Sequence, residues 1–284
     1  MFRLRFLAAA AAAIALAVPA ASADTLQRIK ARKSISMGYR EASVPFSYVG
    51  EGGQPIGYSV ELCTKVARAI QDRLKLAKLE IKWVRVEPGT RVKLLKKGVI
   101  DLECGSTTAT LSRRKEVDFS LLTFADGGSY IAGKASGIAS LADLKGRRTG
   151  VAAETTTQRT LKSAMERGLF ATELVLVKDH ADGLKLLNEG KIDAYASDRG
   201  LLAGLVLAAG KQDSWQVGSE MFSYEPYALM MRRDDPDFRL AVDTELARIY
   251  RTGELFEIYD RWFGAISKPG PLLDSLVFLL GLPE

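Results

Sequence analysis

Guanidinium and hydroxyl side chains occur where two predicted strands end. The strand-like run SISMGY is followed at once by Arg40, and the run VIDLECGS leads into a row of hydroxyl residues and then Arg113. An arginine close to the start of a helix can bind a carboxylate together with the free backbone N–H groups of that helix. We therefore expect the second of these stretches to form a carboxylate site. The hydroxyl residues are Ser106, Thr107 and Thr108.

Two strand ends later in the chain also carry polar side chains. The segment ETTTQRT turns from strand to helix at three threonines, and YASDR ends a strand with Asp198. Arg91 starts a helix, and His180, the single histidine of the chain, lies in KDHADG. The three threonines are Thr155, Thr156 and Thr157.

Each of these signals also has an ordinary structural explanation. Hydroxyl runs cap helices, a lone aspartate forms turns, and an isolated arginine is often a solvated charge. Their shared position nevertheless favours a site, because ligands of open α/β sheets bind outside the carboxyl ends of the strands. The sequence contains no G-x-S-x-G, no P-loop and no G-x-G-x-x-G that opens a βαβ unit. We therefore expect a binding site with no catalytic residues and no cofactor.

A short phrase occurs twice and indicates two similar lobes. KLLKKGVID at 93–101 and KLLNEGKID at 185–193 share a lysine, two leucines, a glycine, an isoleucine and an aspartate. Each phrase predicts a helix, a glycine that ends it and the strand that follows. The surrounding apolar patterns predict β-α-β-α-β twice, which is typical of a mainly parallel sheet flanked by helices. Two such sheets facing one another would enclose a cleft.

The apolar periodicity also locates the elements. We expect the first lobe to comprise 24–125 and 225–284 and the second to comprise 126–224. The C-terminal segment 265–284 is expected to be a tail with a short docked helix, for which the sequence suggests no function. The predicted strands are 34–39, 79–86, 99–106, 147–154, 173–178 and 191–198, and the predicted helices are 59–74, 90–98, 155–168, 179–190 and further ones within 237–263.

The N-terminus predicts export. Arg3 and Arg5 precede an apolar run, and small residues around Ala23 form an A-x-A cleavage site. A membrane anchor is the alternative, but the run is shorter than the ~20 residues that a span needs. Removal of a signal peptide at 1–23 would leave a charge of about +4, from 40 − 2 cations and 34 anions. This charge is too small to predict a nucleic-acid partner.

The two cysteines leave two structures open. In an oxidising compartment, Cys63 and Cys104 could form a disulfide, or they could be two buried thiols. A metal site is not expected, because the chain has one histidine and its cysteines are far apart.

Taken in order, several motifs resemble a known family. GYREASVPFSY, GYSVELCTKVARAI, ECGSTTATLSRRKEVDFS, ADLKGR, AETTTQ, KDHADGLKLLNEGKIDA and RWF are similar to the periplasmic substrate-binding proteins of polar amino-acid ABC transporters, solute-binding protein family 3. The resemblance covers about 25–265, and the combination of RExSVPFSY-like, ECGSTT and KDH motifs is similar to the glutamate/aspartate branch. It implies a type II periplasmic binding protein fold of two α/β lobes that close on the ligand.

The resemblance also implies roles for individual residues. Arg113, assisted by Thr108 and the threonines at 155–157, would hold the ligand α-carboxylate, and Asp198, with the backbone carbonyl of Ser106, would receive its ammonium group. Two departures leave the choice between glutamate, aspartate and a related diacid open: EPGT before Arg91 lacks an expected serine, and ASDR carries an additional arginine. The residues implied around the distal carboxylate are Arg40, Arg91 and His180.

The implied partners are an amino acid and the membrane permease of an ABC transporter. We expect the protein itself to be periplasmic and monomeric. Two alternatives are an exported enzyme on the same scaffold, such as a dehydratase using His180 or Glu154 as acid or base, and a ligand-sensing receptor module.

Overall fold

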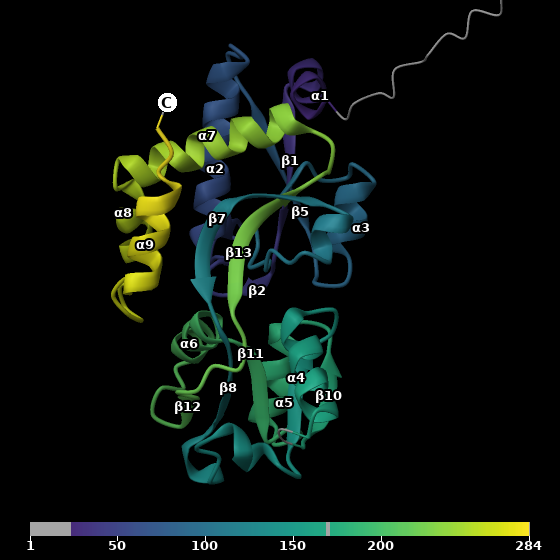
Figure 1. Ribbon diagram of the computed structural model, residues 1–284, viewed down its shortest axis with the longest axis vertical. Coiled ribbons are helices and arrows are strands. Elements are labelled where there is room, and N and C mark those ends of the chain that lie inside the picture. The colour runs from purple at the N-terminus through teal and green to yellow at the C-terminus, as the bar shows by residue number, and fades with distance from the viewer. Residues whose placement is uncertain (1–23, 169–170, 284) are drawn as a thin grey trace, which may run out of the picture.

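The computed structural model describes residues 24–168 and 171–283, which form two α/β bodies arranged along the long axis of the molecule (Figure 1). The first body is built on a five-stranded sheet in the order β5-β1-β6-β13-β7. β1 is parallel to β5 and β6, whereas β13 is antiparallel to its neighbours β6 and β7. The strands are β1 (Ser34–Tyr39), β5 (Glu80–Arg85), β6 (Leu102–Glu103), β7 (Asp118–Asp126) and β13 (Glu225–Met231).

Apart from α1, the helices of the first body form in the segments where the sequence predicts them. In α2, Leu62, Val66 and Ile70 recur at helical spacing and all three are buried in the core. The C-terminal tail also forms a helix, α9, which buries Leu273, Leu276 and Val277. The helices are α1 (Thr25–Arg32), α2 (Tyr58–Arg73), α3 (Arg91–Lys96), α7 (Pro236–Arg251), α8 (Glu254–Phe263) and α9 (Pro271–Leu280), with a 3-10 turn at Arg113–Lys115.

The second body repeats this plan. Its sheet has the order β10-β9-β11-β8-β12, with β9 parallel to β10 and β11 and β8 antiparallel to β11 and β12. The helices are α4 (Thr156–Glu166), α5 (His180–Asn188) and α6 (Arg199–Ala208), with 3-10 turns at Lys134–Ser136 and Leu141–Leu144. The strands are β8 (Gly128–Gly133), β9 (Arg148–Ala152), β10 (Glu173–Val177), β11 (Ala194–Asp198) and β12 (Trp215–Val217).

The repeated phrase has the same structural role in both bodies. Asp101 accepts a hydrogen bond from the backbone N–H of Ser36 at 2.9 Å and donates its own N–H to the carbonyl of Ser36 at 2.7 Å. Asp193 makes the same pair of bonds with Arg148, each 2.8 Å long. The preceding glycine has a φ of 69° in the first copy and 67° in the second, the left-handed region that glycine favours. Each copy thus ends a helix and ties the chain to the adjacent parallel strand.

The structure differs from the predicted elements in several places, and it contains elements that were not predicted, namely α1, α6, β7, β8, β12 and β13. The strand predicted at 99–106 is only Leu102–Glu103, because the chain beyond it turns toward the space between the bodies. A small sheet of β2 (Ala42–Ser43), β3 (Ser47–Val49) and β4 (Pro55–Ile56) was not predicted. Each large sheet is mainly parallel, as predicted, with one strand that runs against the others, β13 in the first body and β8 in the second.

These antiparallel strands include the segments where the chain passes between the bodies, from β7 to β8 and from β12 to β13 (Figure 1). The predicted limits of the two lobes stay a prediction, and the predicted signal peptide lies outside the described residues.

A cluster of aromatic rings packs beside these crossings. The ring centroid of Phe46 lies 4.9 Å from that of Phe124, 5.0 Å from Tyr227 and 5.1 Å from Phe263. Aromatic pairs at such separations add to the burial of apolar area. All four rings belong to one hydrophobic core cluster, which therefore includes residues of both crossing strands, β7 and β13.

Cys63 and Cys104 form a disulfide with a Cα–Cα distance of 6.1 Å, which ties α2 to the end of β6. Within residues 24–168 and 171–283, no helix is long and apolar enough to cross a membrane. The same residues contain no group of three or more histidine, cysteine or acidic side chains that could hold a metal ion.

Candidate functional site

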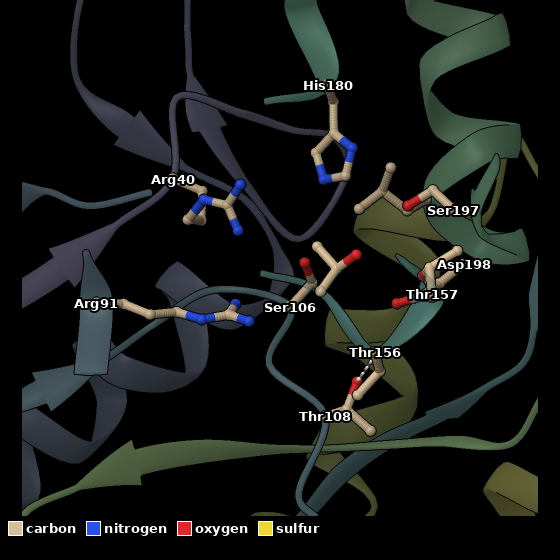
Figure 2. A pocket seen from close by; sticks show the side chains of 11 residues that line it. Arg40, Arg91, Ser106, Thr108, Thr156, Thr157, His180, Ser197 and Asp198 are labelled. Carbon is tan, nitrogen blue, oxygen red and sulfur yellow. Dashed lines mark hydrogen bonds between the residues drawn. The ribbon is translucent and has the colours of Figure 1, made fainter. Parts of the chain in front are cut away.

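A small pocket lies between the two bodies, at the carboxyl ends of β1 and β11. Figure 2 shows side chains from both bodies pointing into it. The lining residues are Arg40, Arg91, Ser106, Thr108, Thr155, Thr156, Thr157, His180, Ser197, Asp198 and Leu201.

The pocket brings together all the predicted site residues except Thr107 and Arg113. Successive side chains of an extended segment point to opposite sides. Ser106 and Thr108 therefore line the pocket, whereas Thr107 is fully buried behind it. The hydroxyl row is thus divided between the pocket wall and the layer that supports it.

Two arginines form one side of the pocket. Arg40 follows β1 and Arg91 begins α3, and each is only 3% exposed. Burial, together with the neighbouring charge of Arg91, lowers the pKa of Arg40 to about 10. Burial is also the main cause that lowers the pKa of Arg91. Two guanidinium groups so poorly solvated favour an anion beside them.

Glu103 and Thr107 support this arginine pair from behind. The Thr107 hydroxyl accepts a hydrogen bond from Nη1 of Arg91 and donates one to Oε2 of Glu103, each 2.7 Å long. Glu103 is fully buried, and its charge opposes the lowering of the pKa of both Arg40 and Arg91. The chain of bonds therefore orients one arginine and keeps an acid close to both.

Arg113 lies next to the pocket wall rather than in it. Its Nη1 donates to the carbonyl oxygen of Thr108 at 2.8 Å, and its backbone N–H donates to the Thr110 hydroxyl at 3.2 Å. Burial, and then the charge of Arg91, lowers the pKa of Arg113 to about 9. The guanidinium group of Arg113 therefore lies directly behind Thr108.

An acid occupies the other side of the pocket (Figure 2). Asp198 ends β11, and its Oδ1 accepts from the Thr157 hydroxyl at 3.1 Å. The Tyr227 hydroxyl donates to its Oδ2. Burial raises the pKa of Asp198 to about 8, and the charges of Glu225 and Asp126 add to this effect. Asp198 would therefore be stabilised in its ionised form by a cation placed in the pocket.

His180 begins α5 and projects from the second body into the pocket. Its Nδ1 lies 2.8 Å from the hydroxyl of Tyr195, a residue of β11. Burial and the charges of Arg40 and Arg91 hold the pKa of His180 well below its usual range. The imidazole is therefore neutral at ordinary pH and offers a hydrogen bond rather than a charge.

Direct contacts join the two bodies along the pocket. Glu225 on β13 accepts hydrogen bonds from the hydroxyls of Thr108 in the first body, at 2.6 Å, and Thr156 in the second, at 2.7 Å. At the rim, Lys178 forms an ion pair with Glu87 at 3.0 Å.

Sequence reasoning missed several residues of the site. Glu103 lies between Leu102 and Cys104 in a predicted strand, and Glu225 lies near two tyrosines in SYEPY. Such acids are rarely buried without partners, which is the signal that could have identified them. A charge count of Arg40, Arg91, Arg113 and Asp198 alone omits both of these buried acids. The residues missed are Glu103, Tyr195, Ser197, Leu201, Glu225 and Tyr227.

Comparison with known proteins finds relatives over nearly the whole described chain. The family model of bacterial extracellular solute-binding proteins, family 3, matches residues 35–265. An L-glutamate/L-aspartate-binding protein of Pseudomonas aeruginosa is 39% identical over 240 residues, which cover 84% of this chain and 80% of that protein. A glutamate/aspartate import solute-binding protein of Escherichia coli is 33% identical over 269 residues, covering 92% and 89% respectively.

Solved structures are also similar. A substrate-binding protein of an ABC uptake transporter from Streptococcus pneumoniae, with histidine bound, aligns with a TM-score of 0.78 at 23% identity and covers 88% of this chain and 100% of that one. This likeness confirms the type II periplasmic binding protein fold. The relatives named here are binding proteins, so the alternative of an exported enzyme is not favoured. The chain belongs to family 3 of the bacterial extracellular solute-binding proteins.

Proposed function

We propose that this protein binds an acidic amino acid, L-glutamate or L-aspartate, and delivers it to the membrane permease of an ABC transporter. The observation that carries this proposal is the pairing of Arg40 and Arg91 on one side of the pocket with Asp198 on the other. A zwitterion needs one cation and one anion from its binding site. A second carboxylate on the ligand needs further N–H donors, which this arginine pair would supply.

The distal carboxylate would bind at Arg40 and Arg91. Guanidinium groups bind carboxylates through paired, charge-assisted hydrogen bonds that are stronger than neutral ones. Neutral His180 would add an N–H donor from the second body. A ligand with a cationic side chain would be repelled here, because its positive end would meet two buried arginines.

The α-amino end would bind on the opposite side. Asp198 would receive the ammonium group, with the backbone carbonyl of Ser106. Arg113 uses one nitrogen on the carbonyl of Thr108, and its other N–H groups would serve the α-carboxylate together with backbone N–H groups at Thr108 and at the threonines 155–157. Several charged hydrogen bonds of roughly 1.5–3 kcal/mol each support an affinity of about 1 μM after ordering costs.

Such a ligand would favour closure of the two bodies. Arg40, Arg91 and Thr108 come from the first body, and His180 and Asp198 from the second. A molecule that contacts both sets stabilises the closed arrangement over any arrangement that separates them. The closed complex would then be the form that the permease recognises.

We further propose that the chain reaches the periplasm through a signal peptide at 1–23 and acts as a monomer without a nucleic-acid partner. Homologous proteins with glutamate and aspartate in their names support the ligand class. Whether glutamate, aspartate or a related diacid binds best depends on the length of the side chain that fits between the arginine pair and Asp198.

The proposal can be tested with the purified mature chain from Asp24. A thermal-shift screen of the twenty amino acids and small dicarboxylic acids should give its largest increases in Tm for glutamate and aspartate, because a ligand that binds only the folded state raises Tm. Calorimetry should then give affinities for these two that exceed those for glutamine and lysine. A preference for glutamine, histidine or a basic amino acid would contradict the proposed ligand class.

A further inference from the structure

Glu225 has a position that no ligand contact explains. It is only 1% exposed, it begins β13 beside the crossing from the second body, and its side-chain carboxylate bonds only hydroxyl groups among the described residues. Oε2 accepts from Thr108 at 2.6 Å and from Thr156 at 2.7 Å, and Oε1 accepts from Ser223 at 2.6 Å. One buried carboxylate thus connects the wall of the first body with the start of α4 in the second.

We propose that Glu225 is a positioning residue that clamps the two bodies together through Thr108 and Thr156 and fixes the direction in which their hydroxyl groups donate. This inference rests on the proposed function for its effect on ligand binding. Its effect on the relative position of the bodies does not depend on which ligand binds.

Counting hydrogens supports the directional part of the proposal. A threonine hydroxyl has one hydrogen to donate and two lone pairs that accept. The hydroxyl oxygens of Thr108 and Thr156 lie 3.2 Å apart, and each also lies within 2.7 Å of Oε2 of Glu225. When both hydrogens point to an ionised Glu225, neither threonine has a hydrogen left for the other or for a ligand. Both hydroxyls then present lone pairs to the pocket that they line.

This arrangement determines which groups can bind a ligand carboxylate at this end of the pocket. A ligand carboxylate placed beside Thr108 and Thr156 would find only acceptors in their hydroxyl groups. It would have to bind through N–H groups, those of Arg113 and of the backbone at the start of α4. Glu225 would therefore raise the selectivity of this end of the pocket for a ligand with separate anionic and cationic groups.

The clamp should influence closure. A hydrogen bond to a charged group is stronger than one between neutral groups, and burial away from water strengthens it. The Thr156 bond exists only while the two bodies are close together, since Thr156 belongs to the second body and Glu225 to the sheet of the first. Loss of this bond should shift the bodies apart.

The first experiment measures the bodies without any ligand. Small-angle X-ray scattering of the ligand-free protein should give a larger radius of gyration for Glu225→Gln and for Thr156→Val than for the wild type. Thr156→Ser, which keeps the hydroxyl, should restore the wild-type value. Glu257→Gln is the matched control, because Glu257 is exposed on α8. Equal radii for Glu225→Gln, Thr156→Val and the control would overturn the clamp.

The second experiment measures coupling. Calorimetry with glutamate should show affinity weakened by about tenfold or more in Glu225→Gln and in Thr156→Val, the loss of one charged hydrogen bond. In the double variant the loss should be smaller than the sum of the two, because the residues act through the same bond. Losses that add independently would contradict the proposal. If Glu225→Gln does not fold, a comparison of the glutamate affinities of Thr156→Val and Thr156→Ser provides the same test.

The third readout separates positioning from a merely structural role. The negative charge of Glu225 is one of the causes that raise the pKa of Asp198, so Glu225→Gln should move the pH dependence of glutamate binding toward lower pH. An unchanged pH profile would contradict a role for the charge. The titratable groups that act on Asp198 are Arg91, Asp126, Tyr195, Glu225 and Tyr227.

The two proposals can fail separately. If wild-type protein binds no acidic amino acid, the proposed function fails while the scattering experiment still tests the clamp. If glutamate binds and the variants leave both the radius and the affinity unchanged, the clamp fails and the proposed function stands.

Discussion

The hydroxyl of Tyr195 lies 2.8 Å from Nδ1 of His180, on the side of the imidazole that meets β11. A neutral imidazole carries one N–H, and the hydrogen bond on one ring nitrogen determines which nitrogen keeps the hydrogen. If Tyr195 donates to Nδ1, the hydrogen is on Nε2. His180 then provides an N–H donor for a carboxylate in the pocket.

We predict that Tyr195→Phe weakens glutamate binding by up to about tenfold, because a neutral hydrogen bond contributes about 0.5–1.5 kcal/mol. Glutamine binding should change less. His180 is the single histidine of the chain, so ¹⁵N NMR can report its tautomer without overlap. A hydrogen on Nδ1 in the wild-type protein, or equal losses for the two ligands, would refute this role.

Binding should release a proton. Burial and nearby acids raise the pKa of Asp198 to about 8, and a bound ammonium group would stabilise its ionised form and lower that pKa. Affinity should therefore increase by up to about tenfold per pH unit from pH 6 toward 8 and level off above 8. Calorimetry in buffers of different ionisation enthalpy measures the protons released. A heat that is independent of buffer at pH 7 would contradict the prediction.

Glu103 should stabilise the protein and moderate its preference for anions. Glu103→Gln keeps an oxygen acceptor for Thr107 but removes the charge beside Arg40 and Arg91. We expect the free energy of unfolding to fall by about 1–3 kcal/mol, while the ratio of glutamate to glutamine affinity rises.

The control for Glu103 is Glu116→Gln, which breaks an exposed ion pair with Lys96. Exposed pairs contribute at most about 1 kcal/mol, so its unfolding curve should nearly match that of the wild type. If Glu103→Gln lowered stability no more than this control, or lowered the affinity ratio, its charge-balancing role would be wrong.

The disulfide should contribute much stability and little affinity. Cys63 and Cys104 are separated by 41 residues, and closing a loop of this length stabilises a protein by roughly 4 kcal/mol in the chain-entropy model. We predict that the double Cys→Ala variant unfolds at lower denaturant concentration and still binds glutamate within about tenfold of wild type. A loss of stability below about 1 kcal/mol would contradict the prediction. As a control, a reducing agent should leave the unfolding curve of the variant unchanged.

The architecture of the molecule was largely predictable because the same local pattern occurs twice. Helix, left-handed glycine and aspartate recur at 93–101 and 185–193, and each aspartate bonds the strand beside it. The antiparallel strands β8 and β13 were not predicted, since strand direction depends on where the chain crosses between bodies rather than on local apolar spacing. The tail helix α9 was predictable from its apolar residues, whereas those residues do not indicate a function for it.

Most of the pocket was predictable because parallel strands bring their carboxyl ends to one edge. Arg40 and Asp198 are examples, although they are far apart in the sequence. Thr107 lies behind the pocket, unlike Ser106 and Thr108, because successive side chains of an extended segment point to opposite sides. Glu103 and Glu225 were missed because their roles depend on partners distant in sequence, which no local pattern identifies.

The most direct measurement compares glutamate and glutamine in wild-type protein and in Arg91→Ala by calorimetry. The two ligands differ only in whether the side chain ends in a charged carboxylate or a neutral amide. If the two buried guanidinium groups bind the distal carboxylate, the variant should lose at least about tenfold more affinity for glutamate than for glutamine. Equal losses for both ligands, or tighter binding of glutamine by the wild type, would contradict the assignment.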